Sequence, residues 1–178
     1  MNKNENQLDT WLAVEAAQKE RLLAGVGPGV NTRESIAGKT GMEIMQAILN
    51  GALHYPPIAQ TLDFLLVEVS DGRAVFQGTP GYAHLNPMGT VHGGWFATLL
   101  DSALACAIQT MIPQGKIYTT TELSLNIVRA LTPKVPRVRA EGKVLHCGRQ
   151  LATAEGKLYG PDGKLYAHGT TTCFIMEQ

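Results

Sequence analysis

Two features between residues 84 and 101 could take part in chemistry. The segment reads HLNPMGTVHGGWFATLLD, in which Gly93 and Gly94 precede an apolar stretch that contains Asp101. Glycines at the start of a helix leave backbone N–H groups open to a ligand, and the helix dipole adds about half a positive charge there. Such a helix start could stabilise negative charge on an oxygen, as an oxyanion hole does. Close packing of a helix against a sheet is the other explanation for two adjacent glycines.

Asp101 is a carboxylate inside an apolar helical stretch. Most aspartates are exposed, so one on a buried helix is either held by structural hydrogen bonds or reactive. Gly93 and Asp101 lie about 12 Å apart along a helix axis, at 1.5 Å per residue, so one helix cannot bring both to the same carbonyl group. Two such helices packed antiparallel across a two-fold axis could do so. This spacing predicts an obligate homodimer with two symmetric interface sites.

Length and composition favour one ordinary domain without disulfides. The chain has 178 residues, and 15 basic residues balance 15 acidic ones, so nothing in the net charge favours nucleic acid or a membrane surface. Three widely spaced cysteines indicate reduced thiols. The polar N-terminal segment and the lack of a long apolar run give no signal peptide or membrane span. We therefore expect a soluble, cytoplasmic protein.

The first 40 residues predict a helical extension and linker ahead of the main domain. Residues 8–24 have near-helical apolar spacing and precede the Gly/Pro-rich segment 25–31. The extension is too short for its own core. From residue 41 to residue 178 we expect one domain, which begins with a helix over 41–53 that ends before two prolines.

The order of the remaining elements predicts the fold class. Strands are expected at 62–70 and 73–79 around an Asp71-Gly72 turn, then a buried helix from residue 93 to 112, then strands at 117–131, 135–147, 150–160 and 164–176. An antiparallel sheet wrapped around one central helix accounts for this order. The prediction is an α+β hotdog fold, a curved antiparallel sheet around one long helix, with an N-terminal helical extension.

The string AHLNPMGTVHGGWFATLLDSALACAI resembles the PaaI-like (phenylacetic acid degradation type) hotdog acyl-CoA thioesterases. Their pattern has an Asn six residues before His-Gly-Gly and an acidic residue nine positions after that His. Asn86, His92, Gly93 and Asp101 match it without gaps. The resemblance extends over about residues 40–176 and leaves residues 1–40 outside.

The resemblance implies a role for each matching residue. The Gly93 N–H would polarise the thioester carbonyl group, and Asn86 would help to position that carbonyl or the attacking water. Asp101 would come from the partner chain as nucleophile or general base, and His92 would order the loop. Thr120 matches a hydroxyl that orients water in some members, with Thr119 as the rival. An aryl-specific branch instead has Glu at the acidic position and Thr four residues later, where this chain has Asp101 and Ala105.

Coenzyme A contains phosphate groups, which basic side chains of this sequence could bind. Residues 129–149 contain six basic side chains against one acidic side chain. The resemblance favours Arg149 first and Arg129 second as nucleotide contacts, and we place Gly94 among the substrate contacts. Solvated strand faces are the alternative for most of the basic residues. No cofactor is expected, because coenzyme A is part of the substrate.

Other classes of function fit the sequence less well. No serine lies in a GxSxG motif, Gly38-Lys39-Thr40 lacks the earlier glycine of a phosphate loop, and the histidines and cysteines lack zinc-site spacing. Two rivals stay open: a hotdog acyl-thioester dehydratase or hydratase, and a non-catalytic acyl-CoA sensor. The acyl group, the choice between a dimer and a dimer of dimers, and the role of the extension also stay open.

Overall fold

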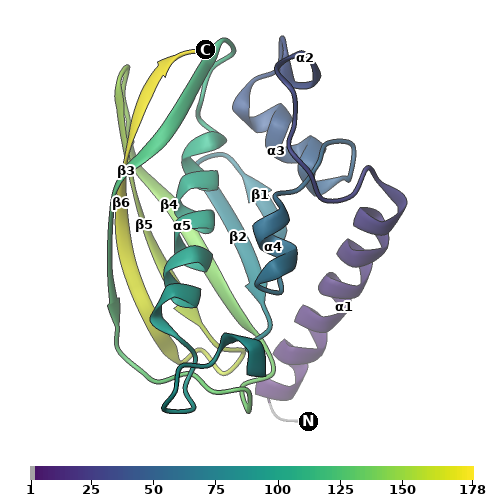
Figure 1. Ribbon diagram of the computed structural model, residues 1–178, viewed down its shortest axis with the longest axis vertical. Helices are drawn as coiled ribbons and strands as arrows, with labels where there is room; N and C mark the ends of the chain where they lie inside the picture. The colour runs from purple at the N-terminus through teal and green to yellow at the C-terminus, as the bar shows by residue number, and fades with distance from the viewer. Residues whose placement is uncertain (1–2) are drawn as a thin grey trace.

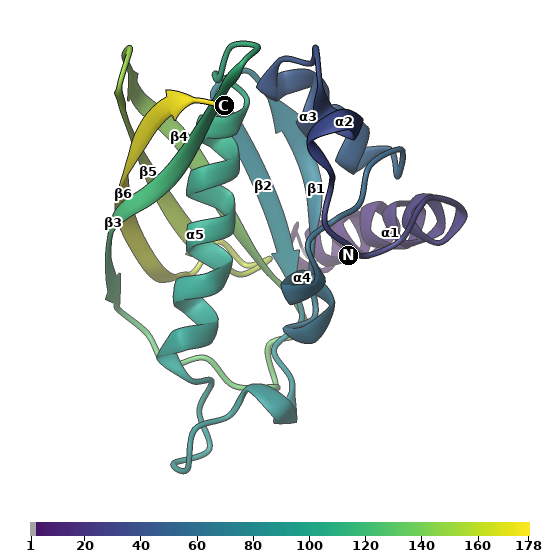
Figure 2. The same cartoon turned by 45° about the horizontal axis from the view of Figure 1, so that its top comes forward.

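The computed structural model describes residues 3–178, with side chains described from residue 6 onward. A six-stranded sheet curves around one long helix (Figures 1 and 2). All neighbouring strands are antiparallel. Across the sheet, the order is β1 (Phe64–Ser70), β2 (Arg73–Gly78), β4 (Val138–Cys147), β5 (Leu151–Tyr159), β6 (Leu165–Glu177) and β3 (Lys116–Ile127). The predicted hotdog architecture is confirmed.

The central helix α5 (Gly93–Gln109) lies in the concave face of the sheet (Figure 2). Its side chains at Leu99, Leu100 and Leu104 are completely buried among inward-facing residues of the strands. Gly142 on β4 makes the close approach possible, because a Cβ there would lie 2.3 Å from the carbonyl oxygen of Ala103. The core therefore holds α5 in one position along the sheet.

Shorter helices cover the open side of the core beside β1. They are α3 (Gly41–Leu49) and α4 (Pro57–Thr61), which both contact β1; α2 (Arg33–Ile36) precedes α3, and the 3-10 turn η1 (Tyr82–His84) precedes α5. Thr40 and Glu43 form a reciprocal capping box that fixes the start of α3. Trp95 of α5 donates to the carbonyl oxygen of Leu62, 2.8 Å away, just after α4. None of the helices in the described range is long and apolar enough to cross a membrane.

The N-terminal helix α1 (Lys3–Ala24) lies against the outer face of the sheet, away from α5 (Figure 2). In β1 and β2, alternate side chains point to opposite faces. Leu65, Val67 and Val75 point outward and pack against Val14 and Leu22 of α1. The extension is thus stabilised by apolar contacts with the outer face of the sheet, because it is too short to form a core of its own.

A buried ionic contact fastens α1 to the sheet. Glu15 is buried and accepts hydrogen bonds from Arg137 and from Gln77, the latter at 2.7 Å. Burial alone would raise the pKa of Glu15, but hydrogen bonds from Arg137, Lys19 and Gln77 lower it to about 2. Arg139 lies over the ring of Trp11, 4.7 Å from its centroid.

The predicted order of the strands and the central helix is confirmed, and the differences lie at the ends of elements and in short helices. The central helix ends at Gln109 rather than at residue 112. The two strands after it leave residues 128–137 as a loop, because Pro133 and Pro136 have no N–H to donate to a ladder. The first helix begins at Lys3, earlier than expected, and α4 was not predicted.

Replacing Glu15 by glutamine tests the attachment of α1. At pH 7 we expect Glu15→Gln to lower the free energy of unfolding by about 2 kcal/mol, because Arg137 loses its charged partner. Since the pKa of Glu15 is lowered, its contribution is complete above pH 4.5 and is lost as the pH falls toward 2. Urea unfolding at pH 7 and pH 2.5 measures both effects. Glu20→Gln, at an exposed position of the same helix, is the control; equal stabilities of the two variants at pH 7 would contradict the account.

Candidate active site

Asp101 lies on a face of α5 that the rest of the described chain covers only in part. This face carries Gly94, Thr98, Asp101 and Ser102, all exposed or half-buried. The Thr98 hydroxyl donates to the Gly94 carbonyl oxygen at 2.9 Å, and the Ser102 hydroxyl donates to the Thr98 carbonyl oxygen at 2.8 Å. Both hydroxyl groups therefore donate their hydrogen bonds to backbone carbonyl oxygens of the same helix. Asp101 is the ionisable group that this face presents.

Thr120 on β3 holds the Asp101 carboxylate. Its hydroxyl donates to Asp101 Oδ1 at 3.2 Å, and Cys173 Sγ lies 3.9 Å from the same hydroxyl oxygen. Thr120 pairs with the buried Cys173 on the inner face of the sheet, whereas Thr119 pairs with the outward-facing Phe174. The structure therefore brings Thr120, and not Thr119, to Asp101.

The surroundings of Asp101 favour its protonated form. Burial raises the pKa of Asp101 above its usual 3.8, and the hydrogen bond from Thr120 partly opposes that rise. Burial, together with the nearby Asp101, also raises the pKa of the Cys106 thiol to about 12. A thiol with that pKa is protonated at neutral pH and is a poor nucleophile. Asp101 is the better candidate for a base or nucleophile.

The N-terminus of α5 presents the backbone amide of Gly93. His92 caps the helix, and its Nδ1 accepts the Gly94 N–H at 2.9 Å. Within residues 3–178 the Gly93 N–H makes no hydrogen bond. Of the two glycine amides, Gly93 is therefore the one open to a ligand, and the Gly94 N–H is occupied by the cap.

Asn86 shapes the loop that leads to this helix start. Its side-chain nitrogen donates to the Thr90 hydroxyl at 2.9 Å, and its Oδ1 accepts the Met88 N–H at 2.9 Å. The backbone N–H of His92 donates to the His84 carbonyl oxygen at 2.8 Å, which joins the two ends of the loop. Both Asn86 and His92 thus contribute to the structure of this loop.

A cleft of about 350 Å³ brings together three of the predicted site residues. Asn86, Gly93 and Arg129 line it, with Phe96 and Ile127 as apolar walls. Asp101 does not line this cleft, because it lies two turns further along α5. Within one chain, the predicted site is divided into an amide end and a carboxylate part.

The predicted basic residues divide in the same way. Arg149 lies in the turn between β4 and β5, where its carbonyl oxygen accepts from Lys116 Nζ at 3.5 Å. Lys116 and Ile127 are the two ends of β3, about 37 Å apart for an extended strand. Arg149 and Arg129 therefore lie toward opposite ends of the sheet.

Two of the six basic residues have a structural role that the sequence did not reveal. Arg137 binds Glu15 of α1, and Arg139 donates to Glu68 at 2.7 Å and to Gln77 at 2.9 Å. These arginines hold α1 and the sheet together rather than forming a solvated face. Glu15 lies one helical turn after Trp11 on the same face of α1, which could have indicated a buried ionic contact there. Its partner Arg137, however, is 122 residues away in the sequence.

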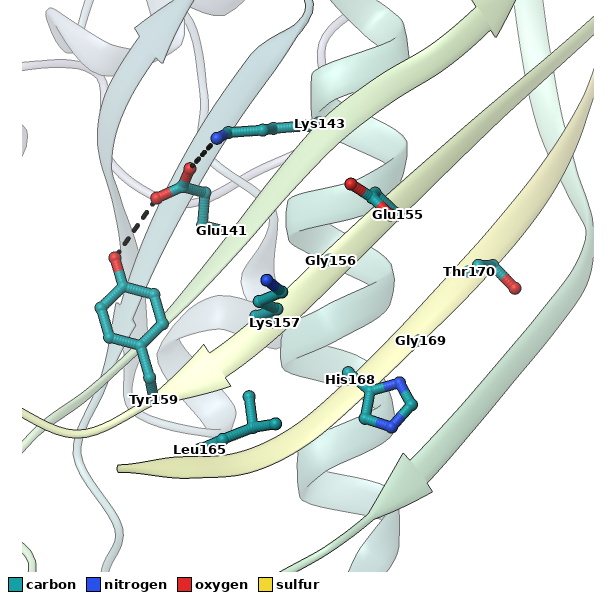
Figure 3. Close-up of a pocket in the computed structure, with 10 residues that line it drawn as sticks. All are labelled: Glu141, Lys143, Glu155, Gly156, Lys157, Tyr159, Leu165, His168, Gly169 and Thr170. Carbon is teal, nitrogen blue, oxygen red and sulfur yellow. Dashed lines mark hydrogen bonds and ion pairs between the residues drawn. The ribbon is translucent and has the colours of Figure 1, made fainter. Parts of the chain in front are cut away.

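A wider hollow of about 420 Å³ lies on the outer face of the sheet over β4, β5 and β6 (Figure 3). Glu141 there is paired with Lys143 at 3.2 Å and accepts from the Tyr159 hydroxyl at 3.3 Å. The sheet separates this hollow from α5 and hence from Asp101. None of the predicted site residues lines it.

Comparisons with known proteins identify the family. The family model described as thioesterase superfamily matches residues 88–167, which include Gly93, Asp101 and Thr120. A Caenorhabditis elegans protein named "Putative esterase F42H10.6" is 31% identical over 133 residues, which are 73% of this chain and 76% of that protein. The chain belongs to the thioesterase superfamily.

Solved structures place this thioesterase among PaaI-like members. The TT0310 protein of Thermus thermophilus is 30% identical with a TM-score of 0.61, and it covers 67% of this chain and 97% of its own. A mutant of the phenylacetic acid degradation protein PaaI from the same organism is also 30% identical, with a TM-score of 0.60 and coverage of 66% and 97%. A phenylacetic acid degradation-related protein of Ralstonia eutropha is 28% identical with a TM-score of 0.67, covering 73% and 98%. This thioesterase therefore has residues that have no counterpart in these shorter structures.

Removing the charge of Asp101 should stabilise the thioesterase at neutral pH. Because the pKa of Asp101 is raised, the native state keeps a proton that the unfolded chain loses just above pH 3.8. The free energy of unfolding therefore falls as the pH rises from that value through the raised pKa. We expect Asp101→Asn to be more stable than the natural protein at pH 7 and equally stable at pH 3, as measured by urea unfolding.

The control for this prediction is Asp162→Asn. The ion pair with Lys164 lowers the pKa of Asp162, so this substitution should give no gain in stability at pH 7. A loss of stability in Asp101→Asn at pH 7 would show that the native state prefers the charged carboxylate, contrary to the account.

Proposed function

We propose that this thioesterase hydrolyses acyl-CoA thioesters at two equivalent sites of a homodimer, each with Asp101 from one chain and the Gly93 N–H from the other. The observation that carries the proposal is the division of the site along α5. A half-buried carboxylate and an open helix-start amide lie about 12 Å apart on one rigid helix, too far to act on one carbonyl group within a chain.

Two uncovered surfaces support a dimer of this geometry. β3 lies at the end of the sheet, where it pairs with β6 on one side only, so its other edge offers twelve residues of backbone to a second chain. The exposed face of α5 lies beside that edge and carries Asp101. Antiparallel pairing of two β3 edges would place two α5 helices antiparallel across a two-fold axis.

The chemistry follows from the two groups. The Gly93 N–H of one chain would bind the thioester carbonyl oxygen and the negative charge that develops on it, assisted by the helix dipole. Asp101 of the other chain would take a proton from water as the water attacks the carbonyl carbon. The tetrahedral intermediate then expels the coenzyme A thiolate, which is a stable leaving group and takes up a proton. In the alternative, the carboxylate attacks directly, forms a mixed anhydride and is released by water.

The raised pKa of Asp101 suits the role of a general base. A carboxylate of higher pKa holds a proton more strongly and so removes one from water more effectively near neutral pH. The Thr120 hydroxyl fixes the orientation of the carboxylate through Oδ1 and leaves Oδ2 for water. Thr120 is thus a positioning residue in this proposal.

Arginines at both ends of the sheet could hold the phosphates of coenzyme A. In an antiparallel dimer, Arg149 of one chain would lie toward the end of the partner chain that carries Arg129 and Gly93. Arginine binds phosphate oxygens through two parallel hydrogen bonds. The nucleotide would therefore lie at the interface near the amide end of each site.

Asp101→Asn tests the assignment of the carboxylate. We expect kcat for acyl-CoA hydrolysis to fall by about 10²–10⁴-fold, because asparagine keeps the shape but cannot accept the proton. Release of free thiol from a panel of acyl-CoAs measures the rate. Thr98→Ala is the matched control on the same helix face, since the Thr98 hydroxyl bonds to its own helix.

Three outcomes distinguish the possibilities. Loss of activity in Asp101→Asn but not in Thr98→Ala supports the proposal. Unchanged activity in Asp101→Asn would move the chemistry to another residue. Binding of acyl-CoA without thiol release by the natural protein would make the chain a sensor rather than an enzyme.

A further inference from the structure

A small apolar cavity of about 60 Å³ lies where α1, α3 and α4 meet β1 and α5. Its walls come from α5, from the sheet, from the short helices α3 and α4 and from α1. The residues that matter here are Ser102 and Cys106 on α5, Met45 on α3, Phe76 on β2, and Gln18 and Leu22 on α1. Ser102 directly follows Asp101 in the sequence, so the cavity reaches the helix that carries the catalytic carboxylate.

Two polar side chains of the cavity, Gln18 and Ser102, already make hydrogen bonds within the protein. The Gln18 side-chain nitrogen donates to the Leu49 carbonyl oxygen at 2.6 Å, and the Ser102 hydroxyl donates to the Thr98 carbonyl oxygen at 2.8 Å. Burial keeps the Cys106 thiol protonated by raising its pKa. A polar guest would lose its water and gain few hydrogen bonds in return, so the cavity favours an apolar one.

We propose that this cavity receives the end of a straight aliphatic acyl chain and that Leu22 and Gln18 of α1 set the chain length the enzyme accepts. The inference rests on the proposed thioesterase function and adds its substrate class. The acyl chain would run from the carbonyl group near Asp101 past Ser102 and end against α1. The extension is then a specificity-determining wall of the site.

Size separates an aliphatic chain from an aryl group. An apolar cavity of about 150 Å³ can hold benzene, and this cavity is well under half that volume. A flexible chain can place its last methylenes in such a space, whereas a phenyl ring requires the walls to move apart. Closely packed walls resist that movement.

The attachment of α1 makes it a firm wall. Glu15 with Arg137, and Trp11 with Arg139, hold the helix against the sheet about two to three turns before Leu22. Leu22 also packs on the outward-facing apolar cluster of β1 and β2. A side chain held in this way can exclude a longer acyl chain rather than give way to it.

Val14 provides a matched control for Leu22. Both side chains are partly buried on α1 and pack against the same apolar cluster, Leu65, Val67 and Val75. Only Leu22 lines the cavity. Substitution of each by alanine removes a comparable packing contact, but only one substitution enlarges the cavity.

The experiment measures kcat/KM for straight-chain acyl-CoAs from acetyl to hexadecanoyl, and for phenylacetyl-CoA. In the natural protein, kcat/KM should rise about fourfold for each methylene that enters the cavity and then stop rising at a limiting length. Leu22→Ala should move that limit to longer chains by roughly the three carbon atoms removed, and Leu22→Trp should move it to shorter ones. Val14→Ala should leave the limit unchanged.

Two results would overturn the inference while leaving the proposed function intact: the same limiting length in the natural protein and Leu22→Ala, or faster turnover of phenylacetyl-CoA than of octanoyl-CoA. If no acyl-CoA is hydrolysed, the proposed function fails, and free fatty acids of increasing length then probe the cavity by thermal shift. In that assay, a limiting fatty-acid length that is greater for Leu22→Ala than for the natural protein supports the cavity assignment by itself. Equal thermal shifts in both proteins refute it.

Discussion

The packing of α5 into the curved sheet is the constraint on which the site depends. Leu99, Leu100 and Leu104 are fully buried, and Gly142 lets the helix backbone approach β4 more closely than any side chain would allow. A helix held in this way cannot slide or bend to bring its ends together. The distance between the Gly93 amide and the Asp101 carboxylate is therefore a fixed property of the chain, and our proposal of a composite site between two chains rests on it.

The same packing sets the chemistry of Asp101. Burial against the core raises its pKa, and the Thr120 hydroxyl limits the rise while it fixes the carboxylate in one orientation. A fully buried carboxylate would be neutral and inert, and a fully exposed one would be a weak base. The partly covered face of α5 gives Asp101 the intermediate burial that the proposed general base requires. In our account, stability at this position is given up for reactivity.

The sequence predicted the central features of this arrangement but not its attachments. The spacing from Asn86 to Asp101 located the helix start and the carboxylate, because both depend on local order along the chain. The choice between Thr119 and Thr120 required the strand register, which a bulge after Thr120 shifts. The packing of α1 on the outer face was not predictable, because its buried stripe includes the polar Glu15, whose partner Arg137 is distant in the sequence.

Complementation between two inactive variants tests the composite site most directly. Gly93→Pro removes the amide N–H at the first position of α5, where proline fits a helix, and His92 already has the extended backbone that precedes proline. The second variant is Asp101→Asn. If each site takes Gly93 from one chain and Asp101 from the other, a 1:1 mixture after subunit exchange should regain about a quarter of the natural activity, because half of the dimers carry one intact site. No recovery in a mixture shown to contain mixed dimers would contradict the shared site.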